Sequence, residues 1–285
     1  MSKYNLICGD CLQKMQAIPD ASIDLILCDL PYGTTACKWD NIIPFDDLWQ
    51  QYNRITKDNS AIVLFGSEPF SSFLRMSNIK SYRYDWIWHK NTGSGFACAN
   101  KMPMKYHENI SVFYKKLPTY NPQYQDYSEE THKRFKNGEQ VNRKAQVLKS
   151  TNKIYGGLSF EGIKKIDYTR GKNPESVQFF KSVPNCNGTR FHPTQKPIPL
   201  LEYLIKTYTN ADDVVLDNCM GSGSTGVACA NTGRDFIGIE LDENYFNIAK
   251  NRIEAAYNAP RLFTENGQKT NFNRCKVRIG KTAFL

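Results

Sequence analysis

Long apolar runs are missing from this sequence: no window approaches the ~20 apolar residues that a membrane span requires. The first residues, MSKYNLICGDCLQ, lack the basic stretch followed by an apolar stretch that forms a signal peptide. Repeats and low-complexity tracts are also lacking, while 40% of the residues are hydrophobic and 13% are aromatic, which excludes fibrous and disordered classes. We therefore expect a soluble, cytoplasmic protein with no membrane partner.

Metal-binding patterns are nearly absent as well. Cys8 and Cys11 have the Cys-x-x-Cys spacing of a zinc site, but no second such pair and no spaced pair of histidines completes it. Several of the nine cysteines lie inside apolar runs, among them Cys28, Cys219 and Cys229, as suits small buried residues in a reducing compartment. We expect no metal, with a zinc site at the first pair as the alternative.

Acidic residues are scarce in one segment. Residues 115–190 hold 15 lysines and arginines against 7 aspartates and glutamates, so this segment carries +8 of the chain's net charge of +9. Cations displace counterions from phosphates and interleaved tyrosines stack on bases, so we expect a nucleic-acid partner here. A solvated, loop-rich insertion is the alternative. The candidate contacts are Lys133, Arg134, Lys136, Arg143 and Lys144.

Apolar runs of strand length alternate with helical patterns on both sides of this basic segment. Strands are expected at residues 22–28, 61–66, 84–90, 109–115, 213–217 and 235–241. Helices are expected at Phe45 to Lys57, Pro69 to Met76, 198–209, Ser224 to Asn231 and Glu243 to Ala256. Short apolar strands separated by helices predict a doubly wound, mostly parallel α/β sheet covered on both faces. Neither half supplies enough strands alone, so one sheet is expected to span both, with residues 115–190 as a separate lobe.

A glycine turn joins a predicted strand to a predicted helix in VVLDNCMGSGSTG. Gly221, Gly223 and Gly226 match G-x-G-x-x-G, whose glycines allow a tight turn and close backbone approach to a ligand at a helix N-terminus. Glu240 ends the next strand, where a carboxylate can accept both ribose hydroxyls of an adenosine. The pattern fits a dinucleotide and S-adenosylmethionine equally well, and glycines that serve packing alone are the structural alternative.

The stretch DLPYG directly follows the apolar strand at 22–28. Open parallel sheets bind ligands beyond the carboxyl ends of their strands, so we expect this stretch on the same edge as the glycine turn. Methyl transfer to an exocyclic aromatic amine needs acceptors for the amine hydrogens and a flat apolar platform for the ring. Asp29 and the main-chain carbonyl of Leu30 or Pro31 can supply the acceptors, and Tyr32 can stack on the ring. A strand-ending turn with a capping aspartate is the alternative.

Together these motifs resemble the amino-methyltransferases of DNA, in the group whose catalytic motif precedes the cofactor motif. The family's Asp-Pro-Pro-Tyr is here DLPY, its glycine-rich motif is DNCMGSGST, and the loop before that motif is HPTQKP, His192 to Pro197. Further matches are YGTTACKWD (32–40), WHKNTGSGF (88–96), HENISVFYK (107–115) and ICGDCLQKM (7–15). The resemblance covers residues 5–115 and 190–256.

This resemblance implies a Rossmann-like methyltransferase sheet with a circularly permuted motif order and an inserted target-recognition lobe. The implied division is a catalytic half at 1–114, the basic target-recognition region at 115–190, a cofactor-binding half of the same domain at 191–260 and a C-terminal extension at 261–285. Two departures stand out: Leu30 replaces the first proline of the tetrapeptide, and Asn218-Cys219 replaces the usual Pro-Phe after Asp217. The second replaces the phenylalanine that in this family makes an apolar contact near the cofactor.

The resemblance also implies roles for individual residues. Asp10 would bind the cofactor's adenine amine and Glu240 its ribose, and an aspartate at position 29 favours adenine over cytosine as the target. A solvated side chain is the alternative for Lys196. The implied catalytic residues are Asp29, Pro31 and Tyr32. The implied contacts of S-adenosyl-L-methionine are Asp10, Asp29, Thr194, Lys196, Asp217, Gly221, Gly223, Ser224, Thr225 and Glu240.

We therefore expect a site-specific enzyme that methylates adenine N6 in double-stranded DNA, after flipping the base from the stack. A cytosine-N4 enzyme of the same family is the nearest alternative. An NAD-dependent dehydrogenase and a DNA-binding protein that no longer methylates are the alternatives from other classes. A homodimer and a cognate restriction endonuclease are left open as partners.

Overall fold

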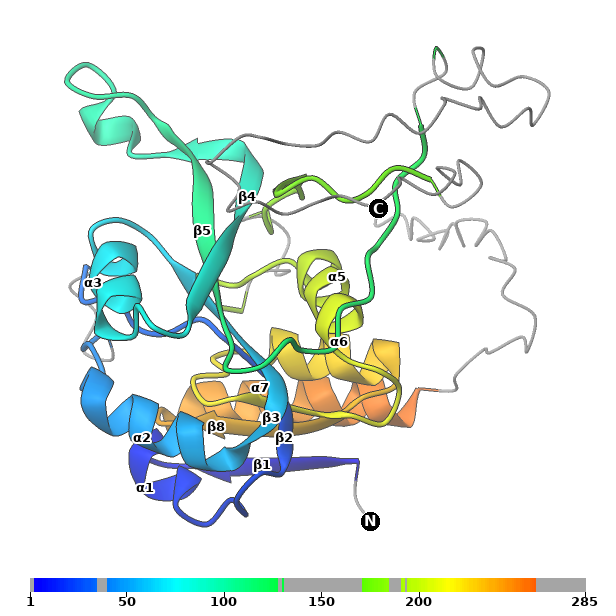
Figure 1. Cartoon of the computed structure of the whole chain (residues 1–285). Helices are drawn as coiled ribbons and strands as arrows, with labels where there is room; N and C mark the ends of the chain where they lie inside the picture. The colour runs from blue at the N-terminus through cyan, green and yellow to red at the C-terminus, as the bar shows by residue number, and fades with distance from the viewer. Residues whose placement is uncertain are drawn as a thin grey trace, which may run out of the picture.

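The computed structural model describes residues 3–34, 40–127, 130, 171–184, 191–192 and 194–259. Within these residues the chain forms one sheet of eight strands, in the order β1-β8-β7-β2-β3-β5-β4-β6 (Figure 1). The strands are β1 (Tyr4–Cys8), β2 (Ile23–Cys28), β3 (Thr56–Gly66), β4 (Tyr82–Ser94), β5 (Lys105–Phe113), β6 (Val177–Phe179), β7 (Val214–Asp217) and β8 (Asp235–Glu240).

The sheet is mostly parallel, as the sequence predicts. Strand β5 alone among the eight runs antiparallel to its neighbours β3 and β4, while the remaining adjacent pairs are parallel. The order along the sheet reverses between β2 and β7: the chain builds outward from β2 to β3, and from β7 to β8 on the other side. The crevice at the carboxyl ends of β2 and β7 is therefore where an open α/β sheet binds its ligand.

Two layers of helices cover the sheet, because the central strands carry buried apolar side chains on both of its faces. In β2, Leu25 and Leu27 face one core cluster while Ile26 and Cys28 face the other. The first cluster packs beneath α5 (Ile198–Tyr208), α6 (Ser224–Thr232) and α7 (Glu243–Asn258). The second packs beneath α1 (Cys11–Met15), α2 (Phe45–Ile55) and α3 (Phe70–Ser77). No helix of the described residues is both long and apolar enough to cross a membrane.

The expected elements are present, with shifted ends. Helix α2 stops at Ile55 and not at Lys57, because Thr56 is already extended (φ −79°, ψ 141°) and pairs with Ile23 as the first residue of β3. The hydroxyl of Thr56 donates to Tyr52 O over 2.6 Å, which closes the last turn of the helix. Strand β1, for which no strand was expected, extends the sheet at the edge beside β8. Helix α1, which was not expected either, packs on the second core cluster.

The basic segment 115–190 is described only at its two ends, 115–127 and 171–184, apart from residue 130. Both ends lie against the main domain. Strand β6 pairs in parallel with β4, and Asn121 N donates to Thr207 O of α5 over 2.7 Å. The sheet thus reaches into a segment that was expected to form a separate lobe. The candidate DNA contacts Lys133, Arg134, Lys136, Arg143 and Lys144 lie outside the described residues, and their role stays a prediction.

Candidate active site

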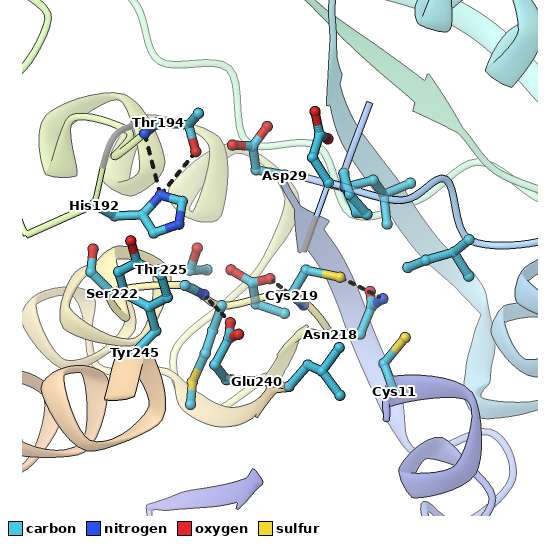
Figure 2. A pocket seen from close by; sticks show the side chains of 18 of the residues that line it. Cys11, Asp29, His192, Thr194, Asn218, Cys219, Ser222, Thr225, Glu240 and Tyr245 are labelled. Atoms are coloured by element: carbon cyan, nitrogen blue, oxygen red, sulfur yellow. Dashed lines mark hydrogen bonds between the residues drawn. The ribbon is translucent and has the colours of Figure 1, made fainter. Parts of the chain in front are cut away.

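A pocket of about 330 Å³ opens at the carboxyl ends of β1, β8, β7 and β2. Its walls come from the residues that directly follow these strands and from the loop before α5 (Figure 2). The sequence motifs therefore meet at one place, although they are widely separated along the chain. Of the predicted residues, those lining the pocket are Asp10, Asp29, Pro31, Tyr32, Thr194, Lys196, Asp217, Gly221, Ser224, Thr225 and Glu240.

The glycine turn is held by a carboxylate from the neighbouring strand. Gly221 adopts a positive φ of 51° and its N–H donates to Glu240 Oε2 over 2.8 Å. The other oxygen of Glu240 accepts from the N–H of Asp242 over 2.9 Å. Burial raises the pKa of Glu240, although these backbone donors oppose the shift. Glu240 therefore shapes the pocket at the end of β8 and turns its carboxylate toward the cavity.

Gly223 does not line the pocket, and its expected role as a cofactor contact stays a prediction. Its N–H donates to Met220 O over 2.8 Å, within the turn itself. A Cβ at this position would come within 2.9 Å of Ala249 Cβ and Ile253 Cδ1, both on α7. Gly223, at φ 78°, is thus required for the packing of α6 on α7. Gly226 is required for packing in the same way, since a Cβ added there would meet the side chains of Ile253 and Phe236.

Asp217 is a buried acid at the end of β7, with 3% of its surface exposed. Burial raises its pKa to about 6, while bonds from the Thr225 side chain and the Cys219 N–H (3.1 Å) limit the rise. Asp217 is therefore ionised at neutral pH inside a pocket that already holds the carboxylates of Asp29 and Glu240. A pocket with this charge favours a cationic ligand.

Asp29 emerges from the end of β2 with both oxygens engaged. Tyr32 Oη donates to Oδ1 over 2.6 Å, and Lys196 Nζ donates to Oδ2 over 2.5 Å. The alternative interpretation, in which Lys196 is a solvated side chain, is wrong, since this side chain is only 8% exposed. Burial raises the pKa of Asp29 and the ammonium of Lys196 opposes that shift. The DLPY tetrapeptide and the HPTQKP loop are joined by this ion pair.

Asp40 fixes the loop after the tetrapeptide, a role that was not predicted from the sequence. Its Oδ1 accepts from the N–H groups of Tyr32 (2.7 Å) and Gly33 (2.9 Å), and its Oδ2 from that of Thr34 (2.9 Å). Three charge-assisted bonds from consecutive amides hold the chain in a turn around one carboxylate. The Trp-Asp ending of YGTTACKWD was the available signal. The ring of Tyr32 stacks on Phe70 of α3, with centroids 4.9 Å apart.

The two departures from the family pattern are both accommodated by the core. Asn218 is buried beside the pocket and its Oδ1 accepts from Tyr52 Oη over 2.6 Å. Cys219, a free thiol, lines the pocket in the place of the family's phenylalanine, and burial beside the free thiols of Cys11 and Cys28 contributes to raising its pKa. Leu30, 4% exposed, belongs to the second core cluster. Tyr52 thus supports the pocket from α2, and no local motif marks it.

The remaining wall carries His192 and Tyr245, whose rings lie 4.4 Å apart near the glycine turn. His192 Nδ1 accepts from the N–H of Thr194 over 3.2 Å, and neither His192 nor Tyr245 was predicted as a site residue. Asp10 also lines the pocket, and its Oδ1 accepts from Gln13 N over 3.0 Å as the cap of α1. In the part of the chain that is described, no group of three or more His, Cys, Asp or Glu could hold a metal ion.

Comparison with known proteins agrees with this geometry. A DNA methylase family model matches residues 23–251. The Type II methyltransferase M.HpaI of Haemophilus parainfluenzae is 27% identical over 267 residues, covering 89% of this chain and 75% of that protein. DNA adenine methyltransferase YhdJ of Escherichia coli (strain K12) is 27% identical over 282 residues, covering 93% of this chain and 88% of that protein.

Solved structures share the fold. The crystal structure of an M1.HpyAVI–SAM complex superposes with a TM-score of 0.57 at 23% identity, over 88% of this chain and 98% of that one. The PvuII DNA methyltransferase, described as cytosine-N4-specific, superposes with a TM-score of 0.59 at 16% identity, over 90% of this chain and 92% of that one. The fold of this chain is therefore a known architecture.

Proposed function

This chain belongs to the DNA methylase family of the N6/N4 type, and on that premise we propose that it methylates N6 of adenine in double-stranded DNA, with S-adenosylmethionine as the methyl donor. The observation that carries the proposal is the position of Asp29 and Tyr32. Both lie at the carboxyl end of β2, beside the strand β7 that leads into the glycine turn, and both line the same pocket as Asp217 and Glu240. An acceptor for an amine thus adjoins a cavity suited to the methyl donor.

The residues of the pocket fit S-adenosylmethionine in charge. Asp217 and Glu240 are buried carboxylates that favour a cation. Helix α6 begins at Ser224 without a side-chain cap from the described residues, so its first N–H groups suit the carboxylate of an amino acid. When bound, S-adenosylmethionine supplies a methyl group: its S–C bond breaks, an N–C bond forms at the target amine, and the amine loses one proton.

Asp29 acts on the amine. The lone pair of an exocyclic amine is delocalised into the ring, so an acceptor that binds the amine hydrogens favours the tetrahedral, more nucleophilic nitrogen. A carboxylate is the stronger acceptor for this purpose because it also stabilises the positive charge that the nitrogen gains during transfer. Tyr32 offers its ring as the platform for the base, and Asp40 holds the backbone of Tyr32 in place. The carbonyl of Pro31 is proposed as the second acceptor.

The basic segment is proposed to bind the DNA around the flipped base. Its charge lies in residues 115–190, and its described end at Val177–Phe179 is joined to the edge of the sheet through β4. The lysines and arginines of this segment would neutralise phosphates and so hold the duplex while the base enters the pocket. Since relatives such as M.HpaI are named as type II methyltransferases, a cognate restriction endonuclease is proposed as a functional partner.

Cytosine N4 is the second candidate target, since the PvuII enzyme with the same fold is described as cytosine-N4-specific. The two targets differ in ring size but present the same kind of exocyclic amine. We favour adenine because an aspartate occupies position 29 and because YhdJ is named as an adenine methyltransferase.

The test is to express the protein in cells without DNA methylation and to analyse their DNA. Mass spectrometry of the nucleosides is expected to find N6-methyladenine, and methylation-sensitive sequencing is expected to find it within one sequence motif. N4-methylcytosine would instead select the second candidate. DNA with neither product, together with measurable DNA binding, would identify a protein that no longer methylates.

A further inference from the structure

Four charges of alternating sign run from the catalytic carboxylate into the β4–β5 hairpin. Asp29 pairs with Lys196 at 2.5 Å, Lys196 Nζ lies 3.3 Å from Glu108 Oε2, and Glu108 Oε1 accepts from Lys90. The side chains of Lys196, Lys90 and Glu108 are 8%, 13% and 16% exposed. This row of charges comes from the end of β2, the loop before α5, β5 and β4. It is therefore a tertiary feature that no single motif contains.

The hydrogen bonds within this row are unevenly distributed. Both oxygens of Asp29 already accept a bond, from Tyr32 Oη and from Lys196 Nζ. Glu108 Oε2 is buried and accepts no hydrogen bond, although the ammonium of Lys196 lies within ion-pair distance. Each oxygen of Asp29 has a further lone pair, but a target amine that binds there must share the carboxylate with these two donors. Glu108 Oε2, an acceptor for Lys196, lies 3.3 Å from Lys196 Nζ.

We propose that Glu108 is a positioning residue that takes over Lys196 when the target amine binds Asp29. The inference rests on the proposed function, because it describes how the same site admits its amine. Lys196 has three N–H donors, so a small movement of Nζ forms a hydrogen bond to Glu108 Oε2 while Asp29 Oδ2 turns to the incoming amine. Lys90 holds the other oxygen of Glu108 and thereby fixes the carboxylate that receives Lys196.

The exchange costs little because the ammonium never loses a counterion. A buried lysine without a carboxylate would be strongly destabilising, but here Lys196 passes between two of them. The pKa of Glu108 would be raised by burial alone, yet Lys196 and Lys90 lower it, so the group is an anion at neutral pH. The other ionisable groups that face this row are Tyr32, Cys28, Lys105 and Asp217.

The variant that tests this is Glu108→Gln, which keeps the shape of the side chain and removes its charge. Single-turnover methylation at saturating DNA and cofactor is expected to slow by ~10-fold to ~100-fold, as for a misplaced reacting group. The affinities for S-adenosylmethionine and DNA are expected to be unchanged. Glu108 raises the pKa of Asp29 by charge repulsion. In Glu108→Gln the pKa of Asp29 should therefore fall, and the acid limb of the pH–rate profile is expected to move to lower pH. A purely structural defect would slow the reaction without moving this limb.

The matched control is Glu68→Gln, which removes a carboxylate that pairs with Arg75 and not with Lys196. It should keep the wild-type rate and the wild-type acid limb. A wild-type rate in Glu108→Gln, or a slower rate with an unmoved acid limb, would overturn the inference. The wild-type protein is measured in the same assay. If it methylates DNA, such a result for Glu108→Gln contradicts the role of Glu108 and leaves the proposed function standing. A wild-type protein that methylates neither base would contradict the proposed function and this inference with it.

Discussion

Lys196 and Asp29 stand 167 positions apart in the chain and form a buried ion pair of 2.5 Å. The pair joins the loop before α5 to the end of β2, and so it joins the half of the domain that is proposed to bind the cofactor to the half that is proposed to be catalytic. Through this pair the carboxylate that is proposed to act on the target amine is fixed beside the cavity that is proposed to hold the methyl donor.

Asp40 is expected to stabilise the loop that carries Tyr32. Asp40→Ala removes the acceptor of three consecutive N–H groups and should lower the free energy of unfolding by about 1–3 kcal/mol. Turnover should fall as well, since Tyr32 loses its anchor. Urea unfolding measures the first effect. As the control, Asp47→Ala removes an exposed acid from the first turn of α2 and should cost no more than ~1 kcal/mol. Equal costs for the two variants would contradict this role.

Two glycines of the same turn should respond differently to alanine. At Gly221 a Cβ would find only the His192 ring, at 3.8 Å, so Gly221→Ala should narrow the pocket and weaken cofactor affinity, with ~1 kcal/mol of backbone strain. At Gly223 the Cβ would press on α7 at 2.9 Å, so Gly223→Ala should lose about 1–3 kcal/mol more of stability. Thermal unfolding and calorimetric titration with S-adenosylmethionine separate the two effects. A folded Gly223→Ala protein with wild-type stability would show that our packing assignment is wrong.

Cofactor affinity should depend on the ionisation of Asp217. Its pKa is raised by burial to about 6, so the group is mostly neutral at about pH 5 and mostly charged at about pH 7. Because the charged form attracts a cationic ligand, affinity for S-adenosylmethionine should weaken as the pH falls through about 6, by up to ~10-fold per pH unit. Titrations across this range measure the dependence. Asp217→Asn should bind more weakly at neutral pH and lose this dependence, and parallel pH curves for the two proteins would contradict the assignment.

The basic segment should supply the salt dependence of DNA binding. Replacing Lys133, Arg134 and Lys136 together with glutamine should weaken binding and flatten the dependence on salt, by up to ~0.9 log unit for each phosphate that is no longer neutralised. The measurement is the DNA dissociation constant across a salt series. Replacing Lys57, Lys80 and Lys14 with glutamine gives a control with the same change in charge outside the segment. An unaltered slope in the first variant would mean that these charges form a solvated surface.

The sequence predicts what is local. The strand at Ile23–Cys28, the glycine turn and the tetrapeptide are each marked by adjacent residues, and the rule that ligands bind at the carboxyl ends of parallel strands brings them to one edge. The resemblance to a known family then assigns their roles. Gly223 shows the limit, because the motif gives a glycine at that position without saying whether its Cβ would face a ligand or a helix.

What sequence reasoning missed depends on tertiary contacts. Glu108 matters because β5 lies beside β4 and within reach of Lys196, and Tyr52 because its hydroxyl reaches from α2 to Asn218 at the end of β7. Asp40 reaches back to three amides across a stretch of irregular chain. Strand β6 was missed because three residues of mixed burial carry no periodic signal.

The most direct test of the central claim is single-turnover methylation by Asp29→Ala at saturating S-adenosylmethionine and DNA. Binding of cofactor and DNA should be largely intact, because the carboxylate is proposed to act on the amine as it becomes tetrahedral and so to contribute in the transition state. The rate should fall by ~100-fold or more. Tyr32→Ala in the same assay should also weaken DNA binding, since its ring is proposed to hold the flipped base. A near-normal rate for Asp29→Ala would show that the tetrapeptide is only the end of a strand, and would contradict the mechanism.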